Sequence, residues 1–365
     1  MEIKSPEYVI ALSLTEEGPQ YKKVYLDENG ERVIEDLKGP LSAIVEVTGK
    51  CNLECAICLN NSGPSVSSKQ LSFERICTLI DELSALSTTS ITLSGGECFL
   101  RKDIFDIFEY ARTRMPVTFS TNGTLLTEKT VGNLLEDGIA GVIVDIHSCN
   151  QEIHDHVTGV KGSFTKAHQG VKTCLEAGIP CSIDMTVTKM NMSTLEETID
   201  FAYNLGVDMV VNKFIPTGRG KVNREKLELT QKEYKKVLSL FYEKQKALKD
   251  TMRLQFDHIP YESLLLDQNT FTGCDAGLNV CKITPEGEVH ACPFLPVSVG
   301  NVLEQSFTEI WQTTPSTTLQ KLRKRQYLKG KCSVCDHRTP CGGCRAFAYA
   351  CTDDFLEEDP SCIVA

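Results

Sequence analysis

The sequence lacks the features that would place the protein in a membrane or outside the cell. No apolar run approaches the ~20 residues that a helix needs to span a bilayer, and Met1–Glu7 lacks the apolar core of a secretion signal. Basic side chains are outnumbered, since 38 Lys and Arg against 49 Asp and Glu give a net charge of −11. Nucleic-acid binding depends on basic side chains that neutralise phosphates. We therefore expect a cytoplasmic protein with neither a nucleic-acid nor a membrane partner.

Cysteine, by contrast, is abundant, with 17 residues in a chain of 365. Without a secretion signal, metal binding explains many cysteines better than a disulfide framework does. Single cysteines scattered through the middle of the chain are typical of buried thiols. The end of the chain is different, because nine cysteines fall there: Cys274, Cys281, Cys292, Cys332, Cys335, Cys341, Cys344, Cys351 and Cys362. Such clustering indicates bound metal.

Six short runs rich in β-branched residues alternate with segments of helical periodicity. The strands are predicted at Ala43–Thr48, Ser90–Ser94, Val117–Ser120, Val142–Ile146, Ser182–Val187 and Asp208–Phe214. The helices are predicted at 72–86, with Ser72 as the N-cap, and at 104–112, 127–136, 164–177 and 193–205. This alternation is typical of parallel βα units in an α/β fold. Six units fit a partial (βα)6 TIM-like barrel. A doubly wound sheet is the alternative, because one sequence does not give strand order.

Three domains follow from these patterns. Residues 1–40 contain strand-like runs at Tyr8–Leu14 and Lys23–Leu26, and Asn29-Gly30 predicts a hairpin turn. Residues 41–250 form the barrel, which ends with a long charged helix at about 230–249. Residues 251–365 form a C-terminal cysteine-rich extension.

Four polar motifs follow the predicted strands, each at its C-terminal end. They are the Cys51-x3-Cys55-x2-Cys58 loop, Gly95-Gly96-Glu97, Ser120-Thr121-Asn122 and Asp145. In parallel α/β folds the ligands gather at this edge of the sheet. We therefore expect all four motifs to face one binding site.

The loop with Cys51, Cys55 and Cys58 offers three thiolates, the ligands that hold iron–sulfur clusters. A [4Fe–4S] cluster held by three cysteines keeps one iron without a protein ligand, and that iron can bind and reduce a small molecule. The alternative is a structural zinc site completed by a distant fourth ligand.

The spacing of this loop resembles the signature of the radical S-adenosylmethionine (SAM) enzymes, in which the open iron chelates SAM. Ile57 departs from the family pattern, because an aromatic residue is usual there. The resemblance implies that Gly95, Gly96 and Glu97 hydrogen-bond the SAM amino group, with Cys98 in place of the usual Pro. It also implies that Ser120, Thr121 and Asn122 contact the SAM ribose and carboxylate, although an ordinary Asn-Gly turn is the alternative.

Two further residues are candidates for binding the cofactor. Asp145 closes the fourth strand at the same edge of the sheet. Thr158 stands where the family usually has an Arg that holds the SAM carboxylate, and Lys161 is a possible substitute. The nearby pair His154 and His156 could suggest a metal site, but we expect the pair to be exposed on a turn.

The C-terminal cysteines resemble the SPASM extension of radical SAM enzymes, which carries two auxiliary iron–sulfur clusters. The resemblance implies two sets of ligands. The first set is Cys274, Cys292 and Cys344, with Cys281 as the fourth ligand; the second is Cys332, Cys335, Cys341 and Cys362. Cys351 is then spare. By itself, the run from Cys332 to Cys344 could also be a zinc ribbon.

The resemblance implies an oxidoreductase or maturase that reductively cleaves SAM to a 5′-deoxyadenosyl radical, which abstracts hydrogen from the substrate. A flavodoxin- or ferredoxin-type protein would donate the electron. The first hypothesis for the substrate is a peptide or protein side chain. The second is a tetrapyrrole side chain in haem-type biosynthesis, favoured by the tail Cys341–Ala346 and by Pro216–Gly220. A zinc-stapled adaptor without enzymatic activity is the alternative from another class.

Overall fold

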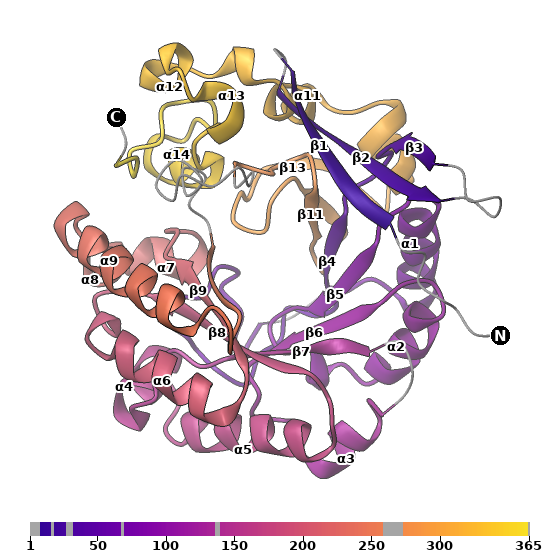
Figure 1. Ribbon diagram of the computed structural model, residues 1–365. Coiled ribbons are helices and arrows are strands. Elements are labelled where there is room, and N and C mark those ends of the chain that lie inside the picture. The colour runs from indigo at the N-terminus through magenta and orange to yellow at the C-terminus, as the bar shows by residue number, and fades with distance from the viewer. Residues whose placement is uncertain are drawn as a thin grey trace.

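A sheet of ten strands forms the centre of the protein (Figure 1). The computed structural model describes residues 8–15, 18–26, 32–66, 69–135, 139–257 and 273–363. In these residues the strand order is β10-β9-β8-β7-β6-β5-β4-β11-β12-β13. The strands from β4 to β10 pair in parallel with their neighbours. Their bounds are Ser42–Glu46 (β4), Ser90–Ser94 (β5), Val117–Thr121 (β6), Ile139–Asp145 (β7), Cys181–Val187 (β8), Asp208–Lys213 (β9) and Leu254–Asp257 (β10).

The six strands predicted for the barrel are confirmed, and the structure adds a seventh. Strand β10 pairs with β9 at one edge of the sheet. Four residues after a long helix carry too little periodicity for this strand to be predicted. At the other edge, β11 (Val280–Ile283) pairs in parallel with β4. Two antiparallel strands, β12 (Glu288–His290) and β13 (Ser298–Asn301), continue the sheet from there. The cysteine-rich segment therefore extends the sheet of the barrel.

Helices cover the outer, convex face of the curved sheet (Figure 1). Their bounds are Phe73–Ala85 (α1), Ile104–Arg112 (α2), Glu128–Gly132 (α3), Gln151–Thr158 (α4), Ser163–Glu176 (α5), Leu195–Leu205 (α6) and Gln231–Leu248 (α9). Ser72 caps α1 by accepting a hydrogen bond from the Arg75 amide, as predicted. Thr230 and Glu233 form a capping box at the start of α9. Helix α3 is shorter than the predicted 127–136, of which the last residue lies outside the described part of the chain.

Alternate residues of each strand point to the two faces of the sheet. On β8, Ile183, Met185 and Val187 are at most 1% exposed and belong to the hydrophobic core under the helices. The residues between them, including Asp184, are half-buried and face the concave side. This polar concave face is where the barrel can hold a ligand.

The N-terminal strands form a separate antiparallel sheet of β1 (Tyr8–Thr15), β2 (Gly18–Leu26) and β3 (Arg32–Asp36). This agrees with the predicted hairpin, although its turn at Asn29-Gly30 lies outside the described residues. The Tyr21 hydroxyl donates a hydrogen bond to the Asp275 carboxylate at 2.7 Å. The small sheet is thereby joined to the cysteine-rich segment.

Short helices complete the chain. They are α7 (Gly218–Val222), α8 (Arg224–Leu227), α11 (Thr317–Arg323), α12 (Gly330–Val334), α13 (Arg338–Cys341) and α14 (Arg345–Thr352). In the described part of the chain, no helix combines the length and the apolarity that crossing a membrane requires.

Candidate functional site

The loop just beyond the end of β4 carries Cys51, Cys55 and Cys58, and the neighbouring thiols affect the pKa values of Cys51 and Cys55. Burial raises the pKa of the Cys51 thiol to about 11, with further contributions from Glu97 and Cys58. Burial also raises the pKa of Cys55 well above its usual value, and the charges of Cys58, Asp145 and Cys51 add to this effect. Cys51 and Cys55, whose ionisation neighbouring thiols oppose, favour a cationic partner. This donor set fits an iron–sulfur cluster.

The loop that follows β9 holds the cysteine loop from one side. The Arg219 guanidinium donates hydrogen bonds to the carbonyl oxygens of Cys55 (2.9 Å) and Ser62 (2.6 Å). The Arg219 main-chain amide donates to the Cys58 carbonyl at 2.9 Å. Gly218 has φ +51°, and a Cβ there would lie 2.3 Å from the Leu59 carbonyl oxygen. Only glycine allows so close an approach. The Pro216–Gly220 motif thus clamps the cysteine loop.

The C-terminal end of α4 holds the cysteine loop from another side. The amide of Glu54 donates to the Thr158 carbonyl at 3.0 Å, and the amide of Ala56 donates to the Val157 carbonyl at 2.8 Å. Free carbonyl groups are available here because the last turn of a helix has no further amides to accept from. Main-chain bonds from two directions therefore fix the loop.

The turn Gly95-Gly96-Glu97 lies against the main chain that leads into Cys51. A Cβ on Gly95 would lie 2.4 Å from the Thr48 carbonyl oxygen, and one on Gly96 would lie 2.3 Å from that of Lys50. The contact of these two glycines with the SAM amino group, which the resemblance implies, stays a prediction. In the structure the two glycines allow the turn to lie close to the main chain of Thr48 and Lys50, so they position the cysteine loop.

Glu97 joins this turn to the end of β6. Its carboxylate is fully buried and accepts hydrogen bonds from the Thr121 hydroxyl (2.8 Å), the Asn122 amide (2.9 Å) and the Phe99 amide (3.1 Å). Burial raises the pKa of Glu97, and these hydrogen bonds oppose the rise. The partners of Glu97 in the structure are donors of the protein, and its hydrogen bond to the SAM amino group stays a prediction.

Asn122 links that network to the cysteines. Its side-chain amide donates to the Asn52 side chain at 2.9 Å and lies 3.7 Å from the Cys51 sulfur. The preceding residues Ser120 and Thr121 lie at the end of β6, as predicted. The structure therefore brings the first three predicted motifs to one place.

The fourth motif, Asp145, lies opposite Asp184 in the register of β7 and β8. The Asn212 side chain on β9 donates to the Asp184 carboxylate at 2.5 Å. Burial raises the pKa of Asp184 to about 7, the hydrogen bond from Asn212 lowers it, and Asp257 raises it. Burial also raises the pKa of Asp145 well above its usual value, with Asp184 as the next cause. This row of acidic and amide groups can hold a shared proton beside the cysteine loop.

Sequence reasoning missed Asp184 and Asn212. Both occupy concave-face positions of predicted strands, Asp184 in the middle of β8 and Asn212 near the end of β9, so alternation along the strands could have found them. Their pairing could not have been found, because it depends on the register between neighbouring strands.

The expectation about the two histidines after β7 needs revision. His154 and His156 lie on helix α4, not on a turn; His154 is 1% exposed and accepts a hydrogen bond from the His147 amide at 3.2 Å. The expectation of exposure is therefore wrong for His154. Burial lowers the pKa of His154 to about 4. Lys161 is exposed between α4 and α5, and its role in binding the cofactor stays a prediction.

Two groups of thiols lie in the C-terminal segment. Burial raises the pKa of Cys344, and the charges of Cys274 and Cys292 add to this rise. In the second group, burial raises the pKa of Cys341 to about 12, with contributions from Cys362 and Cys332. The two groups are adjacent, since the Cys274 amide donates to the Cys341 carbonyl at 2.8 Å.

Cys281 is not placed with either group. It is fully buried in the hydrophobic core, on the strand β11 that pairs with β4, and burial is what raises its pKa. Its role as a fourth ligand stays a prediction that this placement does not support. The spare thiol, Cys351, accepts a hydrogen bond from the Arg224 guanidinium at 3.2 Å.

Among the described residues, no three Cys, His, Asp or Glu side chains converge closely enough to hold a single metal ion.

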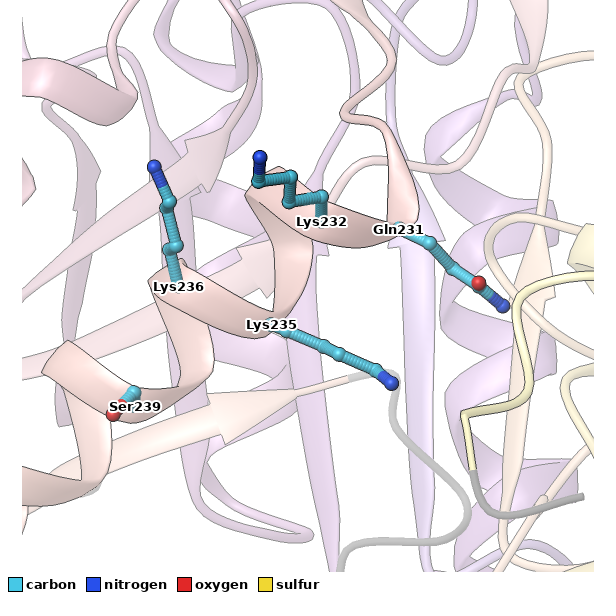
Figure 2. A pocket seen from close by; sticks show the side chains of 5 residues that line it. All are labelled: Gln231, Lys232, Lys235, Lys236 and Ser239. Carbon is cyan, nitrogen blue, oxygen red and sulfur yellow. The ribbon is translucent and has the colours of Figure 1, made fainter.

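Two hollows lie on or near α9. One is a surface basin of about 480 Å³ lined by Gln231, Lys232, Lys235, Lys236 and Ser239 (Figure 2). The other is a pocket of about 130 Å³ between β9, α9 and α14, whose lining includes Lys213, Tyr234 and Phe347.

Comparison with known proteins agrees with these observations. Residues 45–202 match the model of the Radical SAM superfamily, and residues 274–336 match that of the SPASM iron–sulfur cluster-binding domain. The AdoMet-dependent heme synthase of Methanosarcina barkeri is 36% identical over 335 residues, which are 87% of this chain and 95% of that protein. The mycofactocin maturase MftC of Mycolicibacterium smegmatis is 30% identical over 335 residues, 90% of this chain and 83% of that protein.

Solved structures share the fold. The structure of Streptococcus suis SuiB bound to S-adenosylmethionine superposes with a TM-score of 0.74 at 16% identity, covering 90% of this chain and 78% of that chain. The native structure of anSMEcpe with bound AdoMet gives a TM-score of 0.68 at 21% identity, covering 88% and 93%. The partial barrel predicted from the sequence is thus confirmed.

Proposed function

The chain belongs to the radical SAM enzymes that carry a SPASM iron–sulfur domain, and on this premise we propose that it modifies a side chain of a tetrapyrrole. The family assignment replaces the zinc-stapled adaptor as an interpretation. The cofactors are then a SAM-binding [4Fe–4S] cluster, SAM and auxiliary clusters. When bound, the cluster and SAM supply a 5′-deoxyadenosyl radical that removes a hydrogen atom from the substrate.

We assign the cofactors to the thiol groups that the fold brings together. Cys51, Cys55 and Cys58 hold the SAM-binding cluster. Cys274, Cys292 and Cys344 hold the first auxiliary cluster. Cys332, Cys335, Cys341 and Cys362 hold the second. The effects of neighbouring thiols on the pKa values of Cys55, Cys341 and Cys344 support these groups, and Cys335 is assigned to the second auxiliary cluster from the resemblance alone.

The other residues of the site position these groups. Arg219 and the end of α4 hold the cysteine loop rigid, and Glu97 fixes the turn of Thr121 and Asn122 beside Cys51. Such preorganisation keeps a reactive centre in a productive geometry. Asp145 and Asp184 face the concave side, where their carboxyl groups can hydrogen-bond the SAM ribose or the substrate. The barrel wall around them excludes water from the reaction.

One observation carries the choice of substrate: the identity of 36% extends over 95% of the heme synthase from Methanosarcina barkeri. The mycofactocin maturase MftC is 30% identical over a smaller share of its own length, 83%. The Pro216–Gly220 motif, which favoured a tetrapyrrole in the sequence, clamps the cysteine loop in the structure and carries no weight in the choice. The order of the two substrate hypotheses is thus reversed.

The test is a direct comparison of substrates. Anaerobically reconstituted protein is incubated with SAM, a low-potential reductant and either a siroheme-derived porphyrin with carboxylate side chains or a candidate precursor peptide. We expect 5′-deoxyadenosine and a mass change in the porphyrin. A Cys51/Cys55/Cys58→Ala variant is the control and should give neither product. A mass change in the peptide alone would contradict the proposal.

Modification of a peptide side chain is the second candidate function. The similarity to the PqqA peptide cyclase of Granulibacter bethesdensis, which is 25% identical over 338 residues, favours it. In either case a flavodoxin- or ferredoxin-type protein is the proposed electron donor.

A further inference from the structure

Three buried cationic side chains surround the two thiol groups of the C-terminal segment. Lys213 is 6% exposed, and Arg325 and Arg345 are each 1% exposed. A buried charge is costly unless a counter-charge or hydrogen bonds compensate it. The described residues do not compensate all of these charges.

Lys213 has the least compensation. It ends strand β9 with its side chain toward α9 and α14, and its Nζ makes no hydrogen bond within the described residues. The ammonium lies 4.2 Å from the centre of the Phe347 ring and 5.3 Å from that of Tyr234. A cation over an aromatic face gains much less free energy than the burial of a charge costs. A stronger counter-charge is required.

The thiol group of Cys274, Cys292 and Cys344 can supply a counter-charge to Lys213. The Phe347 amide donates a hydrogen bond to the Cys344 sulfur at 3.4 Å. The ring that Lys213 lies over therefore belongs to a residue in contact with a proposed cluster ligand. Burial raises the pKa of Cys344, and Lys213 opposes that rise, as a cation near a thiolate does.

The two arginines lie beside the same thiol groups. Arg325 donates to the Cys274 carbonyl at 2.6 Å, while its Nε and Nη1 make no hydrogen bond within the described residues. A Cβ on Gly342, next to Cys341, would lie 2.4 Å from the Arg325 guanidinium carbon. The Nη2 of Arg345 lies 3.9 Å from the Cys332 sulfur. Each thiol group therefore has a buried cation next to it.

We propose that Lys213, Arg325 and Arg345 are the internal counter-charges of the auxiliary clusters and raise their reduction potentials. This inference rests on the proposed function, because it requires clusters at these cysteines. A reduced cluster carries one more electron than an oxidised one, so a fixed positive charge stabilises the reduced form. A buried carboxylate, Asp359, also lies beside these thiols and accepts a hydrogen bond from the Cys344 amide at 2.8 Å, so the test below isolates the effect of the Lys213 charge.

Lys213→Met is the sharpest test, because it removes the charge without leaving a main-chain carbonyl unpaired. The measurement is a potentiometric titration of the cluster-loaded full chain, followed by electron paramagnetic resonance. The same titration of the Cys51/Cys55/Cys58→Ala chain assigns the auxiliary signals. We expect the ratio of reduced to oxidised auxiliary cluster at a fixed potential to fall at least tenfold, which is 59 mV for a one-electron couple.

Two controls separate the local charge from other effects. Lys213→Arg keeps the charge and should leave the midpoint nearly unchanged. Lys221→Met removes an exposed cation that pairs with Asp353, and should not move the midpoint. A shift in Lys221→Met equal to that in Lys213→Met would overturn the proposal.

The remaining outcomes are also decisive. An unchanged midpoint in a fully loaded Lys213→Met protein overturns the inference. If Lys213→Met and Lys213→Gln both lose four irons while Lys213→Arg keeps them, the charge is required to hold the cluster and the inference stands. Loss of iron in all three Lys213 variants overturns the inference, because the side chain would then act through its shape and not through its charge. If the unsubstituted chain binds no iron beyond the SAM-binding cluster, the proposed function fails first.

Discussion

The Arg219 guanidinium donates a hydrogen bond of 2.9 Å to the main-chain carbonyl of Cys55, a residue 164 positions earlier in the chain. A second bond from the same group reaches the Ser62 carbonyl. The planar guanidinium can hold two carbonyl groups at a fixed separation, which a lysine cannot do. The cysteine loop therefore owes its shape to a residue beyond the sixth strand of the barrel.

Replacing Arg219 should weaken the SAM-binding cluster and leave the auxiliary clusters intact. Hydrogen bonds from a charged donor contribute about 1.5–3 kcal/mol each, so Arg219→Ala should leave the cysteine loop poorly ordered. We expect the iron content to fall toward roughly eight per chain, with at least tenfold slower formation of 5′-deoxyadenosine. Lys226→Ala, at an exposed position on α8, is the control. Full iron content in Arg219→Ala would show that the clamp is dispensable.

Gly96→Ala should destabilise the protein, because the new Cβ would lie 2.3 Å from the Lys50 carbonyl oxygen. Overpacking of this kind costs about 1–3 kcal/mol. We expect a lower midpoint of thermal unfolding and loss of iron from the SAM-binding site. Gly132→Ala is a matched control in helix α3, where a Cβ meets nothing within 4 Å. That substitution should be neutral or slightly stabilising. Equal effects of the two would contradict this account.

Cys281→Ala should not change the iron content. Its side chain lies in the hydrophobic core, so its removal should cost about 1 kcal/mol through a small cavity. Cys292→Ala is the matched comparison and should lose the first auxiliary cluster. Iron and sulfide analysis after anaerobic reconstitution distinguishes the two. If Cys281→Ala loses as much iron as Cys292→Ala, Cys281 is a ligand after all, and the strand β11 must rearrange when the cluster binds.

The raised pKa of Asp184, about 7, predicts a pH dependence of stability. The folded protein keeps this proton to higher pH than the unfolded chain does, so the contribution of Asp184 is fully present below about pH 4. It is lost as the pH rises toward about 7. Asp184→Asn, which cannot ionise, should show a shallower fall of the unfolding midpoint over this range. Asp106→Asn, at an exposed position on α2, should follow the unsubstituted protein. Parallel curves for all three proteins would refute the assignment.

Much of the barrel could be predicted from local patterns. The helix at 104–112 and the strand at 90–94 have the predicted bounds, because alternation and helical periodicity depend on neighbouring residues alone. The short strand β10 was not predicted, since four residues show little pattern. The burial of His154 was also missed, because it depends on how α4 packs against the end of β7.

The amino-acid sequence by itself determined that three thiols share one loop after the first barrel strand, because Cys51, Cys55 and Cys58 lie within eight residues. Only the tertiary structure decided which distant groups surround that loop. Arg219 reaches Cys55, Asp184 faces Asp145, and Lys213 lies near Cys344 through strand order, register and the docking of α14. Those relationships depend on contacts between segments far apart in the chain. Spacing along a sequence carries no information about them.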